Sequence, residues 1–145
     1  MADKTRTLLI FARCLIAVVL FFNLQAAVLF FLQPEAYLGG FGLEAAVGKP
    51  VVRGFGLLFL MWNIPYLFAL ADPIHHRVSL IEAVIMQALA LAGETAILGM
   101  DGSMPPAAQE TIRRFILFDG GGLILLLVSF FICERIRKQY CGTTE

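Results

Sequence analysis

The sequence predicts an all-α integral membrane protein, a single domain over residues 1–145 whose four transmembrane helices form an up-down-up-down bundle. Hydrophobic residues make up 59% of the chain. Only 15% of the residues are charged, against about 25% in an ordinary soluble domain. Four separate apolar runs each reach the roughly 20 residues that a helix needs to cross a bilayer. These predicted spans cover about residues 8–32, 51–71, 78–98 and 111–133.

The first span follows a short start with two basic residues, residues 1–7, as the core of a secretory signal peptide also would. Its apolar run continues to Leu32 and then meets Gln33 and Pro34 instead of a small-residue cleavage site. We therefore expect a span that is not cleaved. Residues 33–50 combine two prolines and four glycines with several apolar side chains. This composition favours a short interfacial or re-entrant segment between the first two spans.

Proline and polar motifs predict how the second and third spans are shaped. Pro65 lacks a backbone N–H, which removes one helical hydrogen bond, so a kink is expected near Asn63. Ser79, followed by Glu82 three residues later, matches a capping box and predicts the start of the third span. The turn at residues 72–77 is so short that these two spans must be antiparallel neighbours.

Small residues in the second and fourth spans indicate places where helices come close together. Gly54 and Gly56 lie in the second span, and residues 120–122 of the fourth span are all glycine. Glycine lets helix backbones approach each other. The same glycines would alternatively leave room for a ligand.

Basic residues orient the bundle, because the cytoplasmic side of a membrane protein carries the excess of Lys and Arg. Seven basic residues fall on the side of the two termini and the 72–77 turn, and four fall on the other side. We therefore predict that both termini are cytoplasmic. The seven are Lys4, Arg6, Arg13, Arg77, Arg135, Arg137 and Lys138, and the four are Lys49, Arg53, Arg113 and Arg114.

Polar residues from all four spans fall in the outer half of the predicted bundle. A charge without a partner near the bilayer centre costs at least about 2.5–3.5 kcal/mol, so these side chains are expected to pair inside the bundle. One interpretation is structural, because polar side chains often only join helices. The other interpretation is a pocket for a ligand or a proton. The cluster consists of Asn23, Gln25, Arg53, Asn63, Gln87, Glu94, Arg114 and Asp119.

Within this cluster, we expect an ion pair between Arg53 and Glu94. Counted from the 72–77 turn, Arg53 lies 19 residues above Asp72 (72 − 53), and Glu94 lies 17 residues above Arg77 (94 − 77). At about 1.5 Å of rise per residue, the two heights differ by about 3 Å. Asp119 and the outer water are the alternative partners for Arg53.

Two aromatic residues lie at the same depth as the polar cluster. Trp62 and Tyr66 are four residues apart and therefore share a helix face. They either pack in the core or against lipid, or they line a flat apolar pocket suited to a quinone, a sterol or an aromatic molecule.

Several kinds of site are excluded. His75 and His76 are the only histidines and lie together in one turn, which rules out a bis-histidine haem inside the bundle. Cys14, Cys133 and Cys141 have no CxxC spacing, so we predict plain thiols and no metal site. The formal net charge is zero and no nucleic-acid-binding motif occurs, so no nucleic-acid partner is predicted. We identify no catalytic residue.

The four-span outline resembles the DoxX-like family of small bacterial membrane proteins, and two segments carry the likeness. They are FLQPEAYL, residues 31–38, and RGFGLLFLMWNIPY, residues 53–66. The resemblance covers the whole chain in outline and implies a bacterial cytoplasmic membrane. Some members of that family are associated with quinol oxidase or other respiratory assemblies. No catalytic residue is carried over to this chain by the resemblance.

Two functions from different classes compete at this point. The first is a non-catalytic accessory or scaffold subunit of a larger membrane complex, such as a respiratory or other electron-transfer assembly. Its partners would be the lipid bilayer and other membrane subunits, or further copies of the chain. The alternative is a binder of, or membrane enzyme acting on, a lipid-like or quinone-like small molecule in the polar pocket, with Glu94 and Asp119 handling protons. No cofactor is predicted; a bound lipid or quinone belongs to the second function.

Overall fold

A computed structural model describes residues 2–100 and 102–141, and in these residues every regular element is helical. Four helical paths are long and apolar enough to cross a membrane, which confirms the predicted fold class. The short segment expected between the first two spans is also present. The elements are α1 (Ala2–Leu32), η1 (Pro34–Tyr37), α2 (Leu38–Phe41), α3 (Ala45–Trp62), α4 (Ile64–Ala71), α5 (Arg77–Met100) and α6 (Pro106–Cys141).

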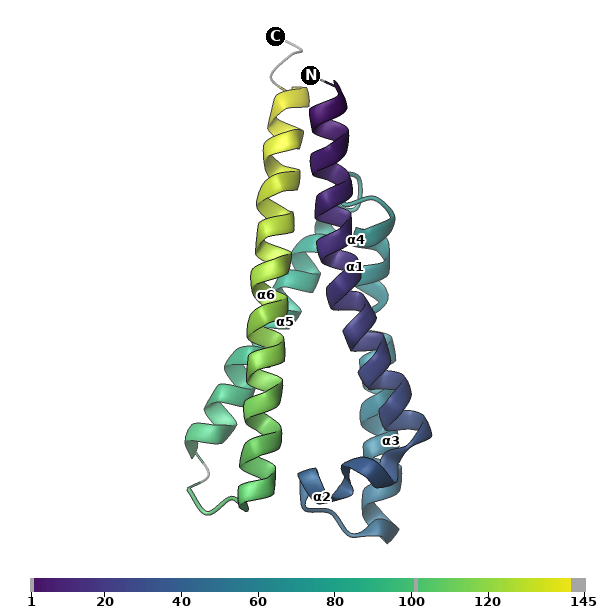
Figure 1. Ribbon diagram of the computed structural model, residues 1–145, viewed down its shortest axis with the longest axis vertical. Helices are drawn as coiled ribbons and strands as arrows, with labels where there is room; N and C mark the ends of the chain where they lie inside the picture. The colour runs from purple at the N-terminus through teal and green to yellow at the C-terminus, as the bar shows by residue number, and fades with distance from the viewer. Residues whose placement is uncertain (1, 101, 142–145) are drawn as a thin grey trace.

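The two ends of the bundle differ in how tightly the helices are packed. At one end, here called the terminal end, α1 and α6 lie side by side and both chain termini emerge together (Figure 1). Toward the other, distal end the helices separate into two arms. One arm pairs α1 with α3, and the other pairs α5 with α6. The short helix α2 lies between the arms at the distal end and contacts α6.

The hydrophobic core occupies the terminal half, where α1, α4, α5 and α6 meet. Its α1 residues, Ala12, Ile16, Val19 and Leu20, recur at three- and four-residue spacing, as expected for one face of a helix. The opposite faces carry large exposed apolar side chains such as Phe21, which suits a lipid environment. The other buried members of the core are Tyr66, Ala69, Leu80, Ala83, Leu126 and Cys133.

The second span is broken at Asn63, as Pro65 predicts. α3 ends at Trp62 and α4 begins at Ile64, because the proline nitrogen has no hydrogen to donate to the preceding turn. The backbone N–H of Asn63 still makes the helical bond to the carbonyl oxygen of Phe59, with nitrogen and oxygen 3.2 Å apart. The two halves pack differently on either side of this break: α3 contacts α1, whereas α4 contacts both α1 and α5.

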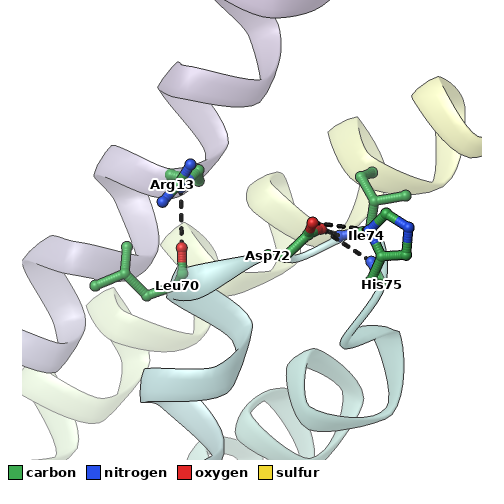
Figure 2. A network of polar contacts seen from close by, with 5 residues as sticks. All are labelled: Arg13, Leu70, Asp72, Ile74 and His75. Carbon is green, nitrogen blue, oxygen red and sulfur yellow. Dashed lines mark hydrogen bonds and ion pairs between the residues drawn. The ribbon is translucent and has the colours of Figure 1, made fainter.

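A hydrogen-bonded turn closes the terminal end between α4 and α5 (Figure 2). Oδ1 of Asp72 accepts hydrogen bonds from the backbone N–H groups of Ile74 and His75, both at 3.0 Å. The bond from the His75 backbone, above all, lowers the pKa of Asp72 below its usual value. Nε of Arg13 donates to the carbonyl oxygen of Leu70 at 2.9 Å. That carbonyl is in the last turn of α4 and lacks a helical partner, so Arg13 ties α1 to the end of α4.

The predicted capping box at Ser79 and Glu82 is wrong. α5 begins at Arg77, so Ser79 already lies inside its first turn. The turn built on Asp72 starts the helix instead, since the N–H of His76 bonds to the Asp72 carbonyl oxygen at 2.9 Å.

Close helix approach occurs at some of the predicted glycines and not at others. A methyl group added at Gly56 would lie 2.7 Å from the carbonyl oxygen of Ala27 in α1, whereas at Gly54 it would meet no atom within 4 Å. In α6, a methyl group at Gly122 would lie 2.8 Å from Nε2 of Gln87, and one at Gly121 would again meet nothing within 4 Å. Gly56 and Gly122 therefore sit at helix contacts, while Gly54 and Gly121 face open space.

Candidate functional site

A chain of buried polar side chains crosses the bundle where the core ends and the arms begin. The hydroxyl of Tyr66 in α4 donates to Oε1 of Gln87 in α5 at 2.7 Å. Nε2 of Gln87 donates to Oδ1 of Asp119 in α6 at 2.6 Å. The carboxyl group of Asp119 lies within hydrogen-bonding reach of Glu94 in α5. Tyr66, Gln87, Asp119 and Glu94, here called the polar chain, therefore connect three helices.

Two further predicted residues lie beside the hydroxyl end of the polar chain. Asn23, a buried residue of α1, and Trp62, at the end of α3, both approach the Tyr66 hydroxyl. Tyr66 itself is fully buried, and the carbonyl oxygen of Ala83, 3.2 Å away, is a second acceptor for its one hydroxyl hydrogen. All four spans thus contribute side chains to one polar site, because each span presents its polar residue toward the bundle axis.

A cavity of about 330 Å³ opens at the carboxyl end of the polar chain, between the two arms. Both Glu94 and Asp119 lie in its wall, together with Gln25 and Arg114. The rest of the wall is apolar. Its six aromatic rings belong to Phe22, Phe30, Tyr37, Phe59, Phe115 and Phe118, and its aliphatic residues are Ala26 and Leu29.

The carboxyl groups of Glu94 and Asp119 form an unusual pair. Two carboxylates repel each other in a medium of low dielectric constant, whereas one proton between them creates a hydrogen bond. In the described part of the chain, Oε2 of Glu94 is buried without a hydrogen-bond partner. Arg114 does not neutralise the pair by contact, because its Nε bonds to Oε1 of Glu110 at 3.2 Å in an exposed ion pair. The site therefore has hydrogen-bonding capacity left for another molecule.

The structure brings most of the predicted cluster together. Asn23, Trp62, Tyr66, Gln87, Glu94 and Asp119 form the polar chain and its surroundings, and Gln25 and Arg114 lie on the cavity wall. Asn63 stands apart at the helix break. It is fully buried, and its Nδ2 donates to the carbonyl oxygen of Phe59 at 2.6 Å.

The predicted ion pair between Arg53 and Glu94 is wrong. Arg53 is exposed and forms no ion pair with Glu94, whose close neighbour is Asp119. Equal height along the two spans would bring the side chains together only if α3 continued the direction of α4. In the residues described, only α4 contacts α5, and α3, on the other side of the break at Asn63, does not. Equal height therefore does not bring Arg53 and Glu94 together.

The aromatic wall of the cavity was not singled out from the sequence, although a signal for it exists. Phe22, Gln25, Ala26, Leu29 and Phe30 follow the i, i+3, i+4, i+7, i+8 pattern of one helix face, and all five line the cavity. A second such face in α6 consists of Phe115, Phe118 and Asp119. Extending each predicted polar position along its own helix face would have found these rings.

Comparison with known proteins does not add a relative: no protein-family model, curated protein sequence or solved structure matches this chain. What the helices establish directly is a small integral membrane protein with four candidate spans. Its function is therefore argued from the polar chain and the cavity.

Gly122→Ala is expected to disturb the polar chain, because the added methyl group would lie 2.8 Å from Nε2 of Gln87. The amide would have to move, and its 2.6 Å bond to Asp119 would lengthen or break. We expect a loss of about 1–3 kcal/mol of stability in detergent, the usual cost of overpacking. Gly121→Ala is the matched control, with no atom within 4 Å. Equal melting temperatures for the two variants would contradict the assigned contact.

Proposed function

We propose that this protein binds a lipid-like or quinone-like small molecule in the cavity between the arms. The observation that supports this most strongly is the cavity itself. Its volume of about 330 Å³ falls within the roughly 300–1,000 Å³ of small-molecule sites. Such sites are mostly apolar and have a few convergent polar groups, and here Glu94, Asp119, Gln25 and Arg114 are those groups.

The carboxyl pair would hold the polar group of the bound molecule, and the aromatic rings would hold its apolar body. A protonated carboxyl group donates a hydrogen bond to a carbonyl oxygen, and a carboxylate accepts one from a hydroxyl group. The pair Glu94 and Asp119 is therefore suited to a molecule that has either group. Gln87 would fix the orientation of the Asp119 carboxyl through the 2.6 Å bond. Whether binding leads to a reaction is a separate question, since no catalytic residue is assigned.

The single tryptophan, Trp62, offers a built-in test, because quinones quench tryptophan fluorescence. We expect 2,3-dimethyl-1,4-naphthoquinone to quench Trp62 saturably in the purified protein. The combined change Glu94→Gln and Asp119→Asn should weaken that binding at least about tenfold, which corresponds to about 1.4 kcal/mol. Glu82→Gln is the matched control, an exposed glutamate on the same helix. Quenching that never saturates, or that is the same in all variants, would refute the proposal.

A second candidate function is the accessory or scaffold subunit, including a subunit of an electron-transfer complex. The observation that favours it is the terminal end, where α1 and α6 extend together beyond the turn between α4 and α5 (Figure 1). The resemblance in outline to DoxX-like proteins, some of which are associated with respiratory assemblies, favours the same function. Purification in mild detergent tests it: a monodisperse particle of monomer mass with no second protein would contradict a subunit role.

We also propose that the terminal end faces the cytoplasm of a bacterial cell, with the cavity in the outer half of the membrane. The excess of basic residues at the terminal end supports this orientation. A green fluorescent protein fused to the C-terminus should fluoresce, and an alkaline phosphatase fused there should be inactive. The reverse pair of results would place the cavity in the inner half instead.

A further inference from the structure

The ligand cavity is covered at the distal end by the segment η1–α2. Between that segment and α6 lies a second cavity of about 340 Å³, lined in part by Ala36, Gly40 and Thr111. The two cavities share three wall residues, Tyr37, Arg114 and Phe115. The carboxyl-lined cavity therefore adjoins the space between η1–α2 and α6 at these three residues.

Aromatic rings form the partition between the two cavities. The ring of Tyr37 in η1 meets Phe30 of α1 edge to face, with centroids 4.6 Å apart. The ring of Phe41 in α2 lies 6.1 Å from Phe115 of α6 and 5.9 Å from Phe30. Two of these rings are carried by η1–α2, so a movement of this segment would open the partition.

The segment is fastened to the arm of α1 and α3 and only rests against the arm of α6. On the first side, the carboxylate of Glu35 forms an ion pair with Lys49 at 2.8 Å. On the other side, Gly40 packs so closely on Thr111 that an added methyl group would lie 2.6 Å from the threonine Oγ1. Among the residues described, no hydrogen bond or ion pair joins η1–α2 to α6. Leaving α6 would therefore cost van der Waals contacts but no polar bond.

The backbone of α2 ends in a hydrogen-bonded glycine turn. Gly42 has a φ of +64°, a conformation that glycine adopts without strain. The N–H of the next residue, Leu43, bonds back to the carbonyl oxygen of Leu38 at 2.9 Å. Because that bond spans Gly42, α2 and its glycine turn form a short closed unit that can move as one piece.

We propose that η1–α2 is a gate: it swings away from α6 to admit a molecule from the distal side into the cavity, and then closes over it. This inference rests on the proposed ligand-binding function and adds the route by which the molecule reaches Glu94 and Asp119. Lid movements of this kind set the rates of binding and release in many proteins.

A disulfide across the contact tests the gate. The position of a Cβ atom on Gly40 lies 3.7 Å from Cβ of Thr111, within the roughly 3.5–4.5 Å that a disulfide requires. We would combine Gly40→Cys with Thr111→Cys in a chain whose native cysteines are replaced by Cys14→Ser, Cys133→Ala and Cys141→Ser. Each single cysteine variant in the same background is a control. The probe is again 2,3-dimethyl-1,4-naphthoquinone, whose blocked ring carbons do not add thiols, and the signal is Trp62 quenching after rapid mixing.

The oxidised double variant should bind and release the probe at least about tenfold more slowly than either single variant. Unchanged rates in the cross-linked protein would overturn the gate while leaving the binding site standing. Saturable binding in none of the variants, nor in the native chain, would overturn the site and the gate together. A second variant, Tyr37→Leu in the native chain, removes one ring of the partition without a cross-link. It should speed both rates, and rates equal to those of the native protein would also count against the gate.

Discussion

Gly56→Ala is expected to lower the stability of the purified protein by about 1–3 kcal/mol, the usual cost of forcing extra atoms into a packed contact. The added methyl group would lie 2.7 Å from the carbonyl oxygen of Ala27 and 2.9 Å from the backbone nitrogen of Phe31. Both atoms belong to the backbone of α1 and cannot rotate away. The arm of α1 and α3 would therefore have to separate along its length. Thermal unfolding in detergent measures the loss.

Gly54→Ala is the matched control for that experiment. It lies one half-turn away on the same helix, where an added methyl group meets no atom within 4 Å. Alanine is favoured over glycine in a helix by about 1 kcal/mol, so this variant should be as stable as the native protein or more so. If the two substitutions shift the melting temperature equally, α1 and α3 do not approach each other at Gly56.

Gln87→Met should produce the largest loss inside the polar chain, about 2–4 kcal/mol. Methionine has a similar length, so the change removes hydrogen bonds while roughly keeping the volume. The Tyr66 hydroxyl would lose its 2.7 Å bond and Asp119 its 2.6 Å bond. A lost hydrogen bond costs about 0.5–1.5 kcal/mol between neutral groups and about 1.5–3 kcal/mol where one partner is charged. Chemical or thermal unfolding in the same detergent would report the difference.

Ile85→Met provides the comparison on the same helix, at a side chain that is 52% exposed. It should change stability by no more than about 0.5 kcal/mol, as is usual for exposed positions. A Gln87→Met protein as stable as this control would mean that the polar chain adds nothing to stability. Binding of the naphthoquinone probe would then decide whether Gln87 serves only to orient Asp119.

The sequence predicted well those features that depend on one helix at a time. Hydropathy located all four spans, Pro65 located the break at Asn63, and the depth of Glu94 and Asp119 along their helices placed these two acids at similar levels. Features that depend on the angles between helices could not be predicted from the sequence. The predicted ion pair between Arg53 and Glu94 failed for this reason. A proline predicts where a helix breaks, but the direction of α3 relative to α4 depends on its packing against α1. The aromatic wall of the cavity escaped prediction for the same reason, since it is formed by the separation of the two arms.

The position of the core in the terminal half has a practical consequence for anyone who extracts this protein from a membrane. An apolar space between two helix pairs attracts whatever hydrocarbon is at hand, and a detergent tail is present at far higher concentration than any natural occupant. A detergent with a slender alkyl tail can therefore compete for the space between the arms, whereas a rigid steroid-based detergent is too bulky to enter that space. Affinities measured in the two media should differ, and the steroid-based medium is the one in which a molecule carried over from the cell has the better chance of staying bound.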